Sequence, residues 1–246
     1  MVAITGNVAV ELLGRDSVRE VDSTGITMPV TKHNFAVKRV EDLADIIRRA
    51  CHIAQAGRPG PVLIDVPKDI TASRCQYERQ SPLPLSPSPR PEESRLAKAA
   101  EMLRQSKRPF LYAGGGVIAS GAAPELLRFA ETLQAPVCTS LMGLGGFPED
   151  HPLSLGMIGM HGSYAAGMAL DHSDLIVVLG ARFSDRGAGD REKSGKQAKI
   201  LKLDVDLAEV DKTVLVDRCL IGALKETSTA INDLLEPQAP REGLAR

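Results

Sequence analysis

Short glycine segments and an acidic residue directly follow the apolar runs of the second half of the chain. They are Gly114-Gly115-Gly116, Gly180 and Asp204. Glycine allows a ligand to approach the backbone closely, and free N–H groups at the start of a helix favour phosphate. A carboxylate at the end of a strand can accept hydrogen bonds from the hydroxyl groups of a ribose. This combination predicts a dinucleotide pocket.

Each of these features also has a simpler structural interpretation. A glycine run after a strand is often only a turn, and Asp204 alone suits a solvated strand end or a helix cap. Arg182 and Arg186 suit surface ion pairs, and Met160 beside His161 suits core packing. The chain has no intact Gly-x-Gly-x-x-Gly segment for NAD and no Gly-x-Ser-x-Gly segment for a hydrolase. Only their convergence on one sheet edge favours a ligand site.

The elements that must position these residues alternate regularly along the second half. Apolar runs predict strands over residues 109–113, 136–139, 175–179, 200–205 and 214–216. Amphipathic segments predict helices over residues 92–105, 124–133, 163–170 and 223–235. Such alternation predicts an α/β fold with a doubly wound, mostly parallel sheet. The carboxyl ends of its strands then share one edge, where ligands bind.

The first 80 residues are typical of part of a second α/β sheet. We expect strands over 2–5, 34–38 and 61–66 and a helix over 41–55, with sheet edges and apolar faces left exposed. The segment SPLPLSPSPRP is an extended linker, because proline cannot donate to a strand ladder or sit inside a helix. The expected organisation is a partial domain over 1–80, a linker over 81–91, the doubly wound domain over 92–236 and a tail over 237–246.

The composition is that of a globular chain, with 43% hydrophobic and 25% charged residues. A net charge of −1 and only 3% aromatic residues argue against a nucleic-acid-binding protein. No apolar stretch approaches the roughly 20 residues of a membrane span, and no secretory signal is recognisable. The four cysteines are far apart and form no cluster with histidine. We therefore expect reduced thiols, no metal site and a cytoplasmic protein.

Longer segments carry a more specific signal. They are AITG (3–6), PVTKHN (29–34), GRPGPVLIDVPKD (57–69), GGG (114–116), LMGLG (141–145), GMHG (159–162) and GARFSDR (180–186). Through them nearly the whole chain resembles the large, catalytic subunit of acetolactate synthase (acetohydroxyacid synthase), a family of thiamine-diphosphate-dependent enzymes.

The resemblance implies a transferase that decarboxylates pyruvate and joins the two-carbon unit to a second 2-ketoacid, in branched-chain amino-acid biosynthesis. It implies three cofactors: thiamine diphosphate, Mg²⁺ and an FAD that undergoes no net redox change. Residues 1–80 would be the second half of the pyrimidine-binding domain, and 92–236 the FAD-holding middle domain. The family's glutamate that contacts the thiamine ring would lie before Met1, and its Gly-Asp-Gly motif for Mg²⁺ after Arg246. We therefore expect the isolated chain to be inactive.

The resemblance also implies roles for individual residues. Those bordering the substrate channel would be Lys68, Arg186, Met160, Val18 and Arg19. Those contacting FAD would be Arg58, Gly114, Gly115, Gly116, Ser140, Leu141, Met142, Gly143, Met160, His161, Gly180, Ala181, Arg182, Asp185 and Asp204. Arg19 departs from the family by placing a cation where a neutral glutamine is usual. Ala223 replaces an aspartate near the adenosine end of FAD.

Three functional hypotheses follow. In the first, the chain is part of an acetolactate synthase, acting on 2-ketoacids as a homo-oligomer or paired with complete catalytic subunits, with the small regulatory subunit a candidate partner. In the second, it is a non-catalytic FAD- or nucleotide-binding or subunit-interaction module of the same descent. The third, an NAD-dependent deacylase of the sirtuin type, lacks support because sirtuins carry a zinc module with two Cys-x-x-Cys pairs, and this sequence has none.

We predict that limited proteolysis cleaves within residues 81–91 and leaves the second half intact, because an extended proline-rich segment is accessible to proteases. Mass spectrometry of the fragments measures this. A first half that resists digestion as well as the second would show that residues 1–80 fold more completely than expected.

Overall fold

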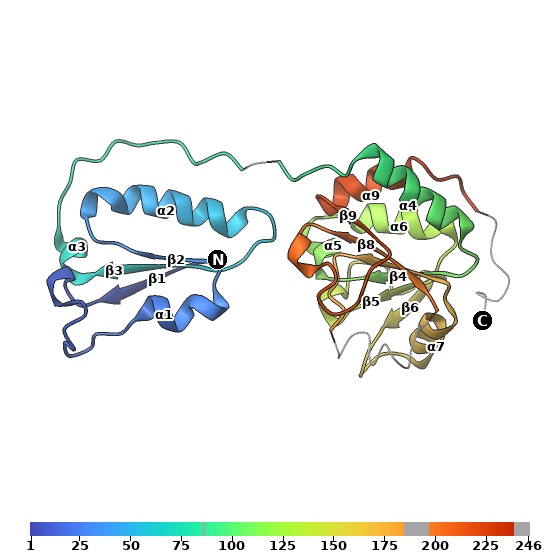
Figure 1. The fold of residues 1–246 in the computed structure, drawn as a ribbon, viewed down its shortest axis with the longest axis horizontal. Helices are drawn as coiled ribbons and strands as arrows, with labels where there is room; N and C mark the ends of the chain where they lie inside the picture. Colours follow the sequence, from blue (N-terminus) through green and yellow to red (C-terminus); the bar gives the residue numbers. More distant parts are fainter. Residues whose placement is uncertain (86, 185–196, 239–246) are drawn as a thin grey trace. The chain divides into compact units, whose positions relative to one another are not determined.

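The computed structural model describes residues 1–85, 87–184 and 197–238 of the chain. These form two compact units, the first over Met1–Pro87 and the second from Ser88 onward (Figure 1). The described residues from Ser73 to Glu92 belong to no helix or strand, and those over 73–85 are exposed. Each unit has its own sheet and its own core.

The first unit is a small parallel sheet with helices on both faces. Its elements are β1 (Val2–Asn7), η1 (Val10–Leu12), α1 (Ser23–Thr27), η2 (Met28–Val30), β2 (His33–Ala36), α2 (Val40–Gln55), β3 (Val62–Pro67) and α3 (Lys68–Ala72). The strand order is β1-β3-β2, and both pairings are parallel. The central strand β3 is buried along its whole length. Helix α2 covers one face of the sheet and α1 lies on the other (Figure 1).

Apolar surface remains exposed in this unit, as the sequence predicts. Ile4 of edge strand β1 is 64% exposed, whereas its register partner Ile64 in β3 is fully buried. Three more large apolar side chains are exposed on α1 and η2: Ile26, Met28 and Val30. A three-stranded sheet with one long helix has too few elements to cover all of its apolar residues.

The second unit is built on a six-stranded parallel sheet. Its elements are α4 (Glu93–Gln105), β4 (Pro109–Ala113), α5 (Gly115–Ala119), α6 (Ala123–Leu133), β5 (Val137–Thr139), η3 (Leu141–Gly143), β6 (Ser154–Met157), α7 (Tyr164–His172), β7 (Leu175–Leu179), β8 (Lys199–Asp204), η4 (Leu207–Glu209), β9 (Arg218–Ile221) and α9 (Leu224–Asn232). The strand order is β6-β5-β4-β7-β8-β9, and every described pairing is parallel. This is the 3-2-1-4-5-6 order of doubly wound folds. The predicted α/β fold class is confirmed.

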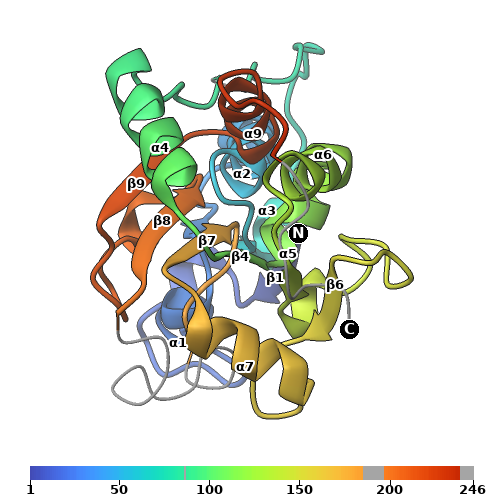
Figure 2. The ribbon, with the colours of Figure 1, turned by 90° about the vertical axis from the view of Figure 1, so that its right-hand side faces the viewer.

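Both faces of this sheet are buried. Helices α4, α6 and α9 cover one face, and α7 covers the other (Figure 2). Alternate residues of the central strands therefore enter two separate cores. Leu111, Val177 and Leu201 face the first, and Phe110, Ile176 and Ile200 face the second; all six are 0–1% exposed. Burial on both faces explains why these strands read as continuous apolar runs.

In the second unit, the sequence-based assignment of strands and α-helices was wrong or incomplete at three places. The strand expected over 214–216 is absent from the described residues, and the last strand is β9, four residues further on, which pairs with β8. Val214 and Val216 instead pack their side chains against the second core. The short elements α5 and β6 were missed because both contain glycine, which is unfavourable in helices and strands.

We predict that the same substitution has a small effect on stability at one position of the first unit and a large effect at its paired position. Ile4→Lys should change the free energy of unfolding by less than about 0.5 kcal/mol, because the side chain is exposed. Ile64→Lys should unfold the unit, because it buries an unpaired charge. Circular dichroism during urea denaturation measures both, and equal stability of the two variants would contradict the assigned burial.

Candidate functional site

The described residues among those predicted for the site in the second unit lie at one edge of its sheet, at the carboxyl ends of its strands. All six strands are parallel, so the loops after their carboxyl ends lie side by side. These loops are 114–116 after β4, 140–143 after β5, 159–162 after β6 and 180–184 after β7, and Asp204 ends β8. The strand order reverses between β4 and β7, which is where doubly wound folds open a ligand crevice.

Glycine is required where the loops after β4 and β7 touch. The Gly114 N–H donates to the Leu179 carbonyl at 2.9 Å, and the Gly116 N–H donates to the Gly180 carbonyl at 3.0 Å. A Cβ on Gly114 would lie 2.3 Å from the Gly180 oxygen, and one on Gly116 would lie 2.7 Å from the Gly180 Cα. Two of the three amides predicted to meet phosphate are therefore already engaged within the protein. The glycines pack two backbones together at the point where the strand order reverses.

The loop after β5 packs against the same place. The Ser140 N–H donates to the Ala113 carbonyl at 2.9 Å, and a Cβ on Gly143 would lie 2.5 Å from that same oxygen. Close packing on this inner side turns the neighbouring side chains outward. Leu141 and Met142 are 69% and 74% exposed.

Exposed apolar side chains gather on the loops after two adjacent strands. Met160, in the loop after β6, is 72% exposed, and His161 beside it is exposed as well. Together with Leu141 and Met142 they place large apolar groups at the sheet edge. Apolar groups gathered near a crevice are typical of a site that accepts a flat, largely apolar ligand.

Arg182 brings a positive charge to the same edge. It is exposed between two buried neighbours, Ala181 and Phe183. The Phe183 ring lies 5.8 Å from that of Tyr112, which is 2% exposed. Burial raises the pKa of the Tyr112 hydroxyl, and the Arg182 charge opposes that rise. The predicted residues Asp185 and Arg186 lie outside the described residues.

Asp204 is buried at the end of β8, beside a lysine that the sequence analysis missed. Asp204 is 8% exposed, and its Oδ1 accepts a hydrogen bond from the Asp206 N–H at 3.1 Å. Its Oδ2 lies 3.7 Å from Nζ of Lys202, which is 2% exposed. A lysine inside the apolar run KILKLD was the available signal, since lysine is almost never fully buried unless it is paired.

A second missed residue is Thr139, at the carboxyl end of β5. It is 6% exposed, and its Oγ1 has no hydrogen-bond partner among the described residues. An unsatisfied buried hydroxyl costs about 1–3 kcal/mol. Water is its expected partner.

The first unit separates the residues that the sequence analysis assigned to it. Arg58 precedes β3 and Lys68 follows it, so the six-residue strand separates them, with one near its amino end and the other at its carboxyl end. Val18 is 88% exposed, and Arg19 is exposed with φ +72°. They lie in a turn closed by the Glu20 carboxylate, whose pKa is lowered by hydrogen bonds from the backbone N–H groups of Gly14 and Ser17.

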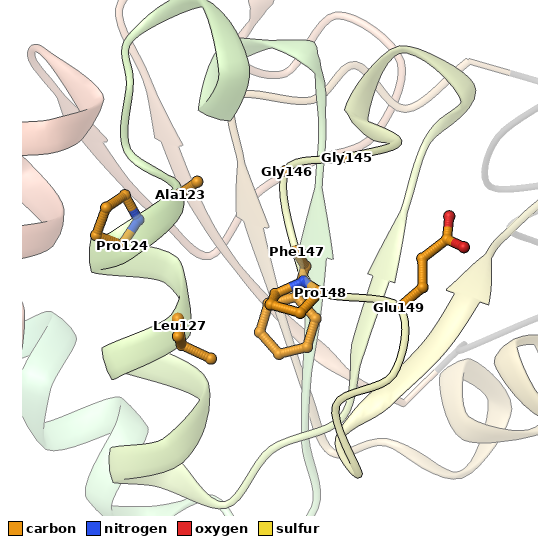
Figure 3. Close-up of a pocket in the computed structure, with 8 residues that line it drawn as sticks. All are labelled: Ala123, Pro124, Leu127, Gly145, Gly146, Phe147, Pro148 and Glu149. Carbon is orange, nitrogen blue, oxygen red and sulfur yellow. The ribbon is translucent and has the colours of Figure 1, made fainter.

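An open pocket of about 440 Å³ lies beside the N-terminal turn of α6 (Figure 3). It is lined by Ala123, Pro124, Leu127, Gly145, Gly146, Phe147, Pro148 and Glu149. None of the predicted site residues is among them. Glu149 supplies its only charged side chain, so the pocket offers mainly apolar contact.

Residues 96–231, more than half of the chain, match the model of a protein family described as "Thiamine pyrophosphate enzyme, central domain". The chain belongs to this family. Among relatives, it is 45% identical over 242 residues to a protein of Methanocaldococcus jannaschii named "probable acetolactate synthase large subunit" and 44% identical over 229 residues to the acetolactate synthase large subunit of Corynebacterium glutamicum. These matches cover 96% and 92% of the chain but 40% and 37% of the relatives, so the chain spans about two-fifths of their length.

A solved structure supports the same membership. An X-ray structure described as that of a "putative thiamin diphosphate-dependent enzyme isolated from Mycobacterium smegmatis" matches 98% of this chain and 46% of its own, with a TM-score of 0.79 and 26% identity. The resemblance to acetolactate synthase large subunits predicted from the motifs is confirmed. The described part of the chain contains no group of three or more His, Cys, Asp or Glu side chains that could hold a metal ion.

All four cysteines are free, and burial raises the pKa of the Cys138 thiol to about 12, which leaves it protonated and unreactive. None of the described helices is long and apolar enough to cross a membrane.

We predict that Gly114→Ala destabilises the second unit by roughly 1–3 kcal/mol or more, because the added methyl group overlaps the Gly180 carbonyl. Gly167→Ala in α7 is the matched control, since a Cβ there meets nothing within 4 Å. It should be neutral or stabilise the unit by about 0.4–1 kcal/mol. Urea denaturation measures both changes, and similar stabilities of the two variants would contradict the close packing of the β4 and β7 loops.

Proposed function

We propose that this chain is a segment of an acetolactate synthase large subunit. Its first unit would be the second half of the pyrimidine-binding domain, and its second unit the middle domain. The observation that carries the proposal is the match to acetolactate synthase large subunits at 41–45% identity over more than nine-tenths of the chain. The whole enzyme would join pyruvate to a second 2-ketoacid.

The second unit has features that fit FAD. The crevice where the strand order reverses is the usual dinucleotide position in this topology. Leu141, Met142 and Met160 would suit the apolar flavin ring, and Asp204 would accept hydrogen bonds from a ribose. Arg182 would face the pyrophosphate, whose charge Gly114 and Gly116 cannot meet through their engaged amides. By resemblance to the family, an FAD bound in the middle domain would have a structural role.

The proposed segment does not supply the metal–diphosphate site of a complete enzyme. Its 246 residues contain no Gly-Asp-Gly segment, which by resemblance would hold Mg²⁺ and the diphosphate. We therefore propose that these residues by themselves bind FAD but do not form acetolactate. Thiamine diphosphate and Mg²⁺ would bind only in a complete enzyme, in which this segment works beside a second copy or a complete catalytic subunit.

FAD titration of the purified chain tests the cofactor assignment. We expect saturable quenching of flavin fluorescence and a rise in melting temperature, because ligand at 100 times its Kd adds about 2.7 kcal/mol of stability. Asp204→Asn should weaken binding by about 10- to 100-fold, the range for a hydrogen bond to a charged group. Asp171→Asn is the matched control, since it removes an exposed carboxylate near the C-terminal end of α7.

Failure of the wild-type chain to bind FAD would refute the cofactor assignment. Equal effects of Asp204→Asn and Asp171→Asn would show that FAD binds elsewhere.

Catalysis is tested separately, by measuring acetolactate formed from pyruvate with FAD, thiamine diphosphate and Mg²⁺ present. We expect no product above background from the chain alone. A complete acetolactate synthase large subunit serves as the positive control for the assay. Turnover by the 246-residue chain would contradict the proposal that it lacks a working metal–diphosphate site.

A further inference from the structure

A buried lysine lies next to the acidic residue at the nucleotide edge. Lys202 is 2% exposed, although its neighbours on the same face of β8 include the core residue Ile200. Burying an ammonium group costs several kcal/mol unless nearby groups compensate for the lost water. An apolar residue at this position would avoid that cost, so the lysine needs a reason beyond packing.

The Lys202 ammonium joins the end of β8 to the turn that follows it. Its Nζ donates to the Glu209 carbonyl of η4 at 2.5 Å and lies 3.7 Å from Asp204 Oδ2. Asp206 caps the same turn, because its Oδ1 accepts a hydrogen bond from the Ala208 N–H at 3.0 Å. Lys202 therefore holds η4 against the strand and forms an ion pair with one oxygen of the Asp204 carboxylate.

Two ion pairs lie at this end of β8 and the turn that follows it. The Glu209 carboxylate lies 3.0 Å from Nζ of Lys212, and the Lys202 ammonium pairs with Asp204. Asp206 adds one more negative charge in the same turn. Lys202 is thus the cation that directly faces Asp204 among the described residues, and its removal would leave a buried carboxylate beside other acidic groups.

We propose that Lys202 is a positioning residue of the nucleotide site. It orients the Asp204 carboxylate through their ion pair, so that the oxygen lone pairs not used by the Asp206 N–H can accept hydrogen bonds from ribose hydroxyl groups. The ligand part of this inference rests on the proposed binding of FAD. The positioning part concerns Asp204 alone.

Two variants separate the charge of Lys202 from its role in fixing the turn. Lys202→Gln keeps a donor for the Glu209 carbonyl but removes the charge, whereas Lys202→Met removes both. Lys199→Met is the matched control, because it removes an exposed lysine at the other end of the same strand. FAD affinity, followed by flavin fluorescence, is the first readout.

We expect Lys202→Gln to weaken FAD binding about 10-fold at neutral pH. Lys199→Met should bind FAD with the wild-type affinity. Wild-type FAD affinity in Lys202→Gln would overturn the proposal.

A double-mutant cycle tests whether Lys202 acts through Asp204. The variant Lys202→Gln/Asp204→Asn should bind FAD no more weakly than Asp204→Asn alone. Additive losses would mean that the two residues act independently, which would overturn the positioning role.

Carbon-13 NMR of labelled aspartate carboxylates gives a readout that needs no ligand. The carboxylate resonance of Asp204 should move in Lys202→Gln and Lys202→Met relative to the wild type and stay in place in Lys199→Met, because only the first two variants remove its ion-pair partner. An unchanged Asp204 resonance overturns the positioning role whether or not FAD binds. A wild-type chain that does not bind FAD overturns the proposed cofactor assignment and the ligand part of this inference, and the NMR comparison distinguishes that failure from the first.

Discussion

The contact between the loops after β4 and β7 is the constraint on which the second unit depends. Two parallel strands that are neighbours in the sheet, but whose connections run to opposite faces, must separate at their carboxyl ends. Here they separate only after their backbones have touched, through the hydrogen bonds from Gly114 and Gly116 to the end of β7. No side chain fits between them. A crevice that opens above such a contact has a floor of rigid backbone.

This packing also explains how polar and apolar groups are distributed at the edge. Glycine at the inner positions turns the neighbouring side chains outward, which leaves Leu141 and Met142 exposed. Further along the sheet, β8 ends in a buried ion pair. The edge therefore offers an apolar surface over β5 and β6 and an acidic acceptor at β8, with Arg182 between them after β7. That order matches a ligand whose two ends differ in polarity.

The predictability of the fold follows from how each strand is buried. Strands β4, β7 and β8 are covered on both faces. β4 and β7 are therefore continuous apolar runs that can be read directly from the sequence, and the apolar run of β8 is interrupted only by Lys202 before it ends in Asp204. β6 and β9 lie at the sheet edges, where packing demands less, and their short segments contain glycine or polar residues. Helix α5 begins with two glycines, which helix propensity disfavours. The close approach of the loop after β7 requires glycine at Gly116. Such tertiary causes leave no local pattern.

The candidate site was predictable to the extent that topology alone brings residues together. Strand carboxyl ends must meet in a parallel sheet, so the loops after β4, β5 and β7 could be grouped before any contact was known. The roles within the group could not be assigned, because they depend on distances. Only the structure shows that the Gly114 amide is engaged by Leu179, and that Lys202 reaches across to Glu209.

The burial and packing of Tyr112 have a consequence for circular dichroism. The chain has no tryptophan and three tyrosines, of which Tyr77 and Tyr164 are 66% and 83% exposed. Only Tyr112 is held in a fixed, asymmetric surrounding, packed against Phe183 in the second unit. Near-ultraviolet circular dichroism arises mainly from immobilised aromatic rings, so its tyrosine band reports the core of the second unit and is nearly blind to the first. A melting curve recorded in that band, set beside one recorded from the peptide backbone, resolves the unfolding of the two units within a single unlabelled chain.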